Sequence, residues 1–126
     1  MLFRSREALE LRRAEMPQSL LVAATAAELG LAREAAKAYD DALALHREAL
    51  AIREKMAPNT SEVAESLERI AVVMSNGNDP LAARNAFERA VDAWSRVSAG
   101  SLDHVNVVYE LGAFLVARRS WPMAAR

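Results

Sequence analysis

Two histidines, an acidic pair and several serines are the side chains that could carry out catalysis or bind a metal. His46 is followed by Arg47-Glu48, which is not the HExxH arrangement of a zinc site, and no second histidine lies at ligand spacing. His104 follows Asp103 at the start of an expected helix, so we expect it to be exposed. Asp40-Asp41 fits the first turn of a helix better than a carboxylate pair for acid–base work.

The serines and glycines also lack the neighbours that their chemistry needs. The glycines form no phosphate-binding loop, and no base accompanies the serines in the candidate positions Ser61, Ser66 and Ser95. The sequence therefore predicts a protein that is not an enzyme and that uses no cofactor and no metal ion.

Composition and charge narrow the classes of protein further. The 126 residues include no cysteine, and 16 basic against 17 acidic residues give a net charge of -1. These values argue against a disulfide-stapled secreted fold and against a nucleic-acid partner. The longest apolar run, from Leu20 to Ala27, is far shorter than the ~20 residues that span a bilayer. No signal peptide is recognisable, so we expect a cytoplasmic protein without a membrane partner.

An internal repeat organises the chain. The segment Arg6–Arg12 matches Arg47–Arg53 at an offset of 41 residues, with five of seven positions identical. Pro80–Arg84 matches Pro122–Arg126 at an offset of 42, with four of five identical. This register divides 1–126 into one array, with the second helix of a partial repeat at 1–16, repeats at 19–57 and 60–98, and a truncated repeat at 102–126.

Each repeat reads as two helices. Apolar residues in Ser61–Ser75 recur at the spacing of one helical face, and Thr60 or Ser61 is suited to cap that helix. Asn76–Pro80 breaks the pattern, with Gly77 or Asn78 expected in the left-handed conformation and Asp79 as the next cap. Alanine is the commonest residue, and we expect it to let helices approach closely where they cross.

The pattern resembles the tetratricopeptide repeat, in the longer branch typical of kinesin light chains and of bacterial regulators. The resemblance is carried by Leu67, Ile70 and Ala71 in one helix, by Ala83, Phe87 and Ala90 in the next, and by Ala42, His46 and Ala49 one period earlier. It implies an all-α, right-handed α-α superhelix of about three helix pairs, incomplete at both ends. It also implies that His46, at the aromatic position, is a structural core residue. Trp94 lies at helical spacing from Phe87 and Val91 and is expected in the core, with an interface anchor as the alternative.

The resemblance implies a protein-interaction scaffold within a larger bacterial regulatory protein. The family's first helices line a concave groove, which here would bind a partner peptide or helix with basic and apolar side chains. The alternative is a solvated face. The positions of the family's carboxylate clamp and asparagine ladder hold other residues, among them Glu28, Arg69 and Leu111. The candidate groove residues are Leu31, Glu65, Glu68, Arg69, Val72, Asn76, Glu110, Phe114 and Arg118.

The two ends of the array leave two readings open. A final helix over about 103–118 would have no partner to cover Val108, Leu111 and Leu115. Either the chain is a fragment of a longer array, or the open ends associate with one another and make it a structural oligomerisation module. Trp121 is expected at the start of a further helix, either in a core or as an interface anchor.

Overall fold

The chain is all-α, as the sequence predicts. The computed structural model describes residues 2–15 and 19–125, with side chains for 6–13 and 19–118, and these ranges contain no strand. Within these ranges none of the helices combines the length and the apolar character needed to cross a membrane. The helices are α1 (Leu2–Glu15), α2 (Leu20–Ala35), α3 (Tyr39–Met56), α4 (Ser61–Met74), α5 (Pro80–Ser98) and α6 (Leu102–Ala125).

The helices begin where polar side chains can cap them. The hydroxyl of Ser19 accepts a hydrogen bond from the Val22 amide, and the hydroxyl of Thr60 accepts one from the Val63 amide. Thr60, not Ser61, is therefore the cap of α4. At α5 the Asp79 carboxylate accepts from the Ala82 amide at 3.0 Å, directly before a proline that suits the first turn.

Two helix boundaries differ from the predictions. The left-handed conformation occurs at Lys37, Asn59 and Gly100, and not at Gly77 or Asn78, because α4 ends in tight turns that close through backbone bonds from Asn76 and Gly77. The expected break before Trp121 is also absent. The backbone of α6 continues through Pro122 to Ala125, since the segment before that proline holds none of the Asn, Gly and Asp residues that end α4. The expected packing of the Trp121 side chain lies outside the described residues.

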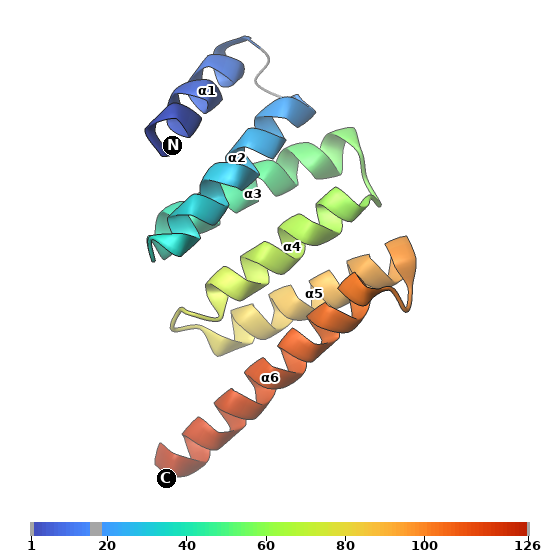
Figure 1. Ribbon diagram of the computed structural model, residues 1–126. Coiled ribbons are helices and arrows are strands. Elements are labelled where there is room, and N and C mark those ends of the chain that lie inside the picture. The colour runs from blue at the N-terminus through green and yellow to red at the C-terminus, as the bar shows by residue number, and fades with distance from the viewer. Residues whose placement is uncertain (1, 16–18, 126) are drawn as a thin grey trace.

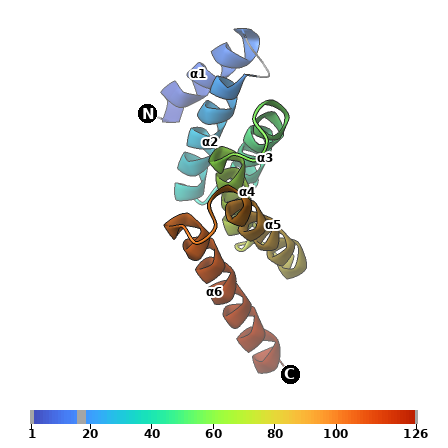
Figure 2. The same ribbon diagram turned by 90° about the vertical axis from the view of Figure 1, so that its right-hand side faces the viewer.

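The six helices follow one another as an extended series. Each helix packs against the next, and the α2–α3 and α4–α5 pairs have the most extensive contacts. The two termini lie at opposite ends of the molecule (Figure 1). The view turned by 90° shows α3 and α5 on the opposite side of the series from α2 and α6 (Figure 2).

Two apolar clusters hold the series together. One joins α4 and α5 to Leu50 of α3 and to Val107 and Phe114 of α6, and the other joins Leu9 of α1 to α2 and α3. Ala83 and Ala90 are fully buried in the first cluster. Small side chains therefore lie where α4 and α5 pack, as expected. This close packing fixes the positions of the neighbouring polar side chains.

Candidate functional site

An open hollow between α4 and α6 gathers four of the nine predicted groove residues. The hollow has a volume of about 590 Å³. Its lining combines apolar and aromatic side chains with one carboxyl group and one guanidinium group. We refer to it as the α4–α6 hollow, and it is lined by Val72, Ser75, Phe87, Tyr109, Glu110, Ala113, Phe114, Ala117 and Arg118.

Two aromatic rings form the floor of the α4–α6 hollow, and a guanidinium lies at its edge. The Phe87 and Phe114 rings lie 5.5 Å apart between centroids and are tilted by 41°. The guanidinium of Arg118 lies 5.4 Å from the centre of the Phe114 ring, within the range of a cation–π interaction. Phe87 and Phe114 are largely buried, whereas Tyr109 at the edge of the hollow is exposed. The hollow thus presents an apolar surface that a partner side chain could cover.

Arg118 also connects α6 to the end of α4. Its Nη2 donates to the carbonyl oxygens of Ser75, at 3.2 Å, and Gly77, at 3.3 Å. Carbonyl groups at the end of a helix have no partner within the helix and carry partial negative charge, so a cation is favoured there. These contacts fix the guanidinium at one edge of the hollow.

A pair of glutamates, Glu68 and Glu110, lies beside the hollow. The Glu68 carboxylate accepts a hydrogen bond of 2.9 Å from the Trp94 indole. Burial raises the pKa of Glu110 to about 7, a hydrogen bond and the charge of Glu68 add to the rise, and Arg69 opposes it. Oε1 of Glu110 is buried without a hydrogen-bond partner among the described residues. A donor or cation from a partner could therefore be accommodated at this carboxyl group.

A second polar group centres on Glu34, at the end of α2. Its carboxylate accepts from Nε of Arg69 at 3.2 Å, and its Oε2 lies 2.6 Å from Nε2 of His46. His46 is buried, as the sequence predicts. Burial lowers the pKa of its imidazole, and this outweighs the opposing effect of the Glu34 carboxylate. Arg69 is thus engaged in a contact within the protein, and this part of the predicted groove is structural in character.

Two of the remaining predicted residues, Leu31 and Glu65, lie beside this structural group. Leu31 and Glu65 are exposed and line a recess of about 10 Å³ together with Arg69. Asn76 is exposed at the end of α4, and its amide donates to the Val72 carbonyl oxygen at 3.1 Å. The recess is too small to enclose a ligand, so the α4–α6 hollow is the stronger candidate for partner binding.

A contact between an arginine and a hydroxyl group occurs twice, and it was not predicted from the sequence. Arg53, which is buried, donates to the hydroxyl of Ser66 at 2.8 Å, and Arg12 donates in the same way to Thr25. The two contacts are related by the 41-residue offset of the repeat. The repeated arginine was visible in the sequence, and the hydroxyl at the matching offset in the following helix was the signal that could have identified its partner.

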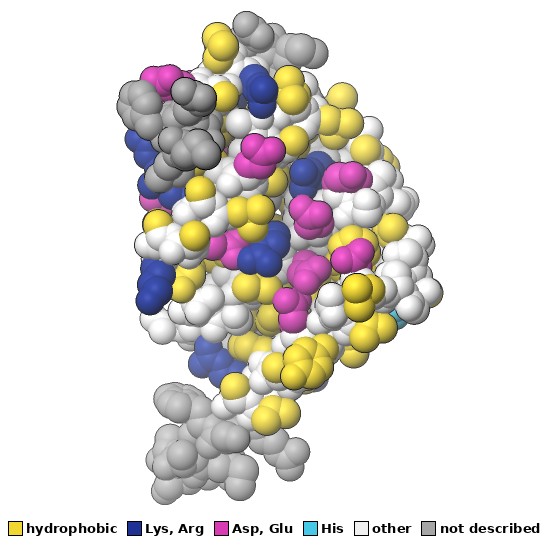
Figure 3. All heavy atoms as spheres, in the orientation of Figure 1, with side chains coloured by type: hydrophobic (Ala, Val, Ile, Leu, Met, Phe, Trp, Pro, Cys, Tyr) yellow, Lys and Arg dark blue, Asp and Glu magenta, His cyan; other side chains and the backbone are white. Residues whose placement is uncertain are grey.

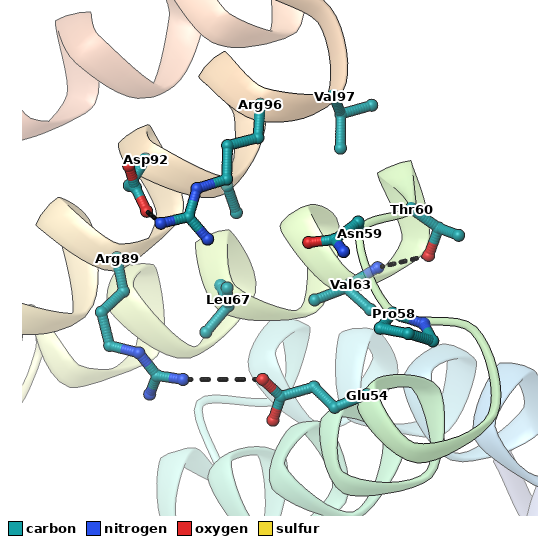
Figure 4. A pocket seen from close by; sticks show the side chains of 11 residues that line it. Glu54, Pro58, Asn59, Thr60, Val63, Leu67, Arg89, Asp92, Arg96 and Val97 are labelled. Carbon is teal, nitrogen blue, oxygen red and sulfur yellow. Dashed lines mark hydrogen bonds and ion pairs between the residues drawn. The ribbon is translucent and has the colours of Figure 1, made fainter.

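A further hollow, of about 230 Å³, lies between the end of α3 and helices α4 and α5 (Figure 4). Its basic side chains have acidic neighbours. Arg89 lies 3.8 Å from Glu54, and Arg96 lies 2.9 Å from Asp92. Because these charged side chains already pair with one another, this hollow has fewer charges available to a partner than the α4–α6 hollow has.

Acidic side chains predominate on the face that carries the candidate site. Figure 3 shows them gathered across the middle of the molecule, with hydrophobic side chains below them toward α6. Glu28 of α2 and Glu65 of α4 are exposed, and Glu68 and Glu110 are half-buried. Among the described residues there is no cluster of histidine and carboxylate side chains suited to hold a metal ion.

Comparison with known proteins identifies no relative, since no protein-family model and no curated protein matches the chain.

Proposed function

We propose that the chain is a tetratricopeptide-like array that acts as a protein-interaction scaffold within a larger regulatory protein. In this proposal, the face formed by α2, α4 and α6 holds a peptide or helix of a partner protein. The α4–α6 hollow is the observation that carries the proposal, because it combines an aromatic floor with an unsatisfied carboxyl oxygen. The internal repeat and its resemblance to that family support the array.

The chemistry of the hollow specifies the kind of segment that would bind. An apolar side chain that covers Phe114 and Val72 would gain about 1.5–3 kcal/mol from burial. A lysine or arginine one turn away on the partner would lie near Glu110 and Glu68, where burial strengthens the attraction between opposite charges. The expected partner is therefore an amphipathic segment with basic and apolar side chains.

A titration with labelled peptides tests this proposal. A fluorescein-labelled peptide of alternating lysine and leucine would be compared with a peptide in which glutamate replaces lysine. We expect the basic peptide to bind, with affinity that falls as salt is added, and the acidic peptide not to bind. Absence of binding by the basic peptide at high micromolar concentration would leave the solvated face as the better description.

A matched pair of variants locates the bound peptide. Ala117 is exposed and lines the hollow, so Ala117→Trp should fill the hollow without disturbing the core. Ala51 is exposed on α3, away from the hollow, and Ala51→Trp serves as the control. We expect the first variant to lose binding by tenfold or more and the second to bind like the wild type. Equal binding by both variants would place the peptide elsewhere.

A second candidate function is a structural oligomerisation module. The observation that favours it is the exposed apolar surface of α6, where Val105, Val108 and Tyr109 are all exposed. Such a surface on a water-exposed helix is typical of a site of association.

A further inference from the structure

The exposed surface of α6 has buried counterparts on α4. Val63, Leu67 and Ala71 are buried on α4 in the cluster that α4 forms with α5. At the 42-residue offset of the repeat, their counterparts on α6 are Val105, Tyr109 and Ala113, and all three are exposed. Val105 is 54% exposed and Tyr109 is 77% exposed. We call these three residues the α6 face.

A different side of α6 packs against α5, and its buried residues correspond to the groove positions Glu65 and Val72 of α4. Val107 and Phe114 are buried in the cluster with α5, and Leu111 and Leu115 pack against them. Val108, which the sequence predicts to be uncovered, is exposed, whereas Leu111 and Leu115 are half-buried because α5 reaches them. The α6 face therefore corresponds to residues of α4 that are covered by α5 and by the end of α3.

The other end of the molecule shows the complementary feature on α1. Leu9 and its counterpart Leu50 are both buried, each in the cluster of the helix that follows it. Leu11 corresponds to Ile52, which is only 3% exposed and packs in the cluster of the preceding helix, α2. Leu11 itself is 60% exposed. The side of α1 that carries Leu11, which we call the α1 face, thus lacks the covering that the repeat provides for α3.

We propose that the α1 face of a second copy packs on the α6 face, so that α6 and the second copy's α1 form a helix pair like α4–α5. This inference rests on the second candidate function and specifies which surfaces meet. The repeat argues for a second copy as the occupant, because the counterparts of the α6 face on α4 pack with α5, a helix that has the same position in the repeat as α1 and α3. Among the described helices of that type, α3 and α5 are already packed on both sides and α1 is not.

The proposed contact joins two different surfaces, and this determines the kind of assembly. The α1 and α6 helices lie at opposite ends of the molecule (Figure 1), so one chain cannot bring its own two faces together. A contact between different surfaces continues from copy to copy, and it gives a linear chain of copies or a closed ring. A symmetric dimer through two α6 faces is the competing arrangement.

Light scattering coupled to gel filtration tests the proposal on the 126-residue chain. We expect the wild-type mass to rise with concentration. Leu11→Arg and Tyr109→Arg each place a charge at an exposed position of one face, and we expect each variant alone to remain monomeric. Leu81 is exposed on α5 outside both faces, and Leu81→Arg should assemble like the wild type. Circular dichroism would verify that all three variants keep the wild-type helix content.

The two blocked variants should still recognise one another. Leu11→Arg retains an intact α6 face and Tyr109→Arg retains an intact α1 face, so an equimolar mixture should form a dimer of one copy of each and nothing larger. A Leu11→Arg variant that self-associates would overturn the proposal in favour of paired α6 faces.

A wild-type chain that stays monomeric at high micromolar concentration would also overturn the proposal, and would point to a helix from a longer protein on α6. Tyr109 and Ala113 also line the α4–α6 hollow, so a second copy and the peptide would compete for this part of α6. Light scattering without peptide, and the peptide titration at concentrations where the chain is monomeric, therefore test the two proposals separately.

Discussion

The contact between Gly30 and His46 gives the sharpest prediction about stability. A Cβ atom added to Gly30 would lie 2.7 Å from Cε1, 2.9 Å from Nε2 and 3.0 Å from Nδ1 of the His46 ring. The ring has no room to withdraw, because His46 is 1% exposed and its Nε2 lies 2.6 Å from a Glu34 carboxylate oxygen. Gly30→Ala must therefore displace the ring or separate α2 from α3.

Three terms set the magnitude of this effect. Overpacking of a well-packed interior costs about 1–3 kcal/mol. Loss of the contact between His46 and Glu34 costs about 1 kcal/mol. Alanine in place of glycine within a helix contributes about 0.5–1 kcal/mol in the other direction. The last two terms nearly cancel, so we expect Gly30→Ala to lower the free energy of unfolding by about 1–3 kcal/mol.

Urea denaturation followed by circular dichroism measures this change, and a double-mutant cycle identifies its cause. In a His46→Ala background the added methyl group meets no ring, so the same Gly30→Ala change should raise the free energy of unfolding by about 0.5–1 kcal/mol. The sign of the effect thus reverses between the two backgrounds. Equal changes in both backgrounds, or a more stable Gly30→Ala single variant, would refute the proposed packing of α2 on α3.

Two further predictions concern α5 and the glutamate pair. Ala83→Leu should overpack the α4–α5 contact and lower the free energy of unfolding by about 1–3 kcal/mol. Asn85→Leu, at an exposed position of the same helix, should change it little. An unchanged unfolding midpoint for Ala83→Leu would contradict the placement of Ala83. Because the pKa of Glu110 is raised to about 7, the folded protein keeps a proton that the unfolded chain releases at lower pH, so the free energy of unfolding falls as the pH rises to about 7 and levels off above it. Glu110→Gln should remove roughly 1 kcal/mol of this decrease in the free energy of unfolding, a small value because solvent screens the half-buried carboxyl group. Urea titrations at acidic and at alkaline pH measure the decrease. The same pH dependence in the variant and the wild type would exclude Glu110 as its cause.

The sequence predicts local features of the fold well. The caps at Thr60 and Asp79, the acidic first turn of α3 and the burial of Ala83 follow from residue types that have few alternatives. The continuation of α6 through Pro122 was not predicted. A proline alone restricts one residue and removes one donor, and it ends a helix more reliably when flanking residues favour a turn.

Four of the nine predicted groove residues line the α4–α6 hollow, and the geometry of the hollow was not predictable. Glu68 and Glu110 occupy equivalent positions of neighbouring repeats, and both were expected in the groove. Their shared burial depends on the distance between α4 and α6 and on Trp94 of α5, and no sequence spacing contains that information. For the same reason, the engagement of Arg69 by Glu34 became visible only when the two helices were placed side by side.

One side chain belongs at once to the α4–α6 hollow and to the turn that joins α4 to α5. Arg118 covers the ring of Phe114 and also holds the carbonyl groups of Ser75 and Gly77. The turn is also closed by backbone hydrogen bonds from Asn76 and Gly77, so it does not depend on Arg118 alone. A partner that displaced the guanidinium from the Phe114 ring would therefore remove one side-chain contact of that turn and leave its backbone bonds in place.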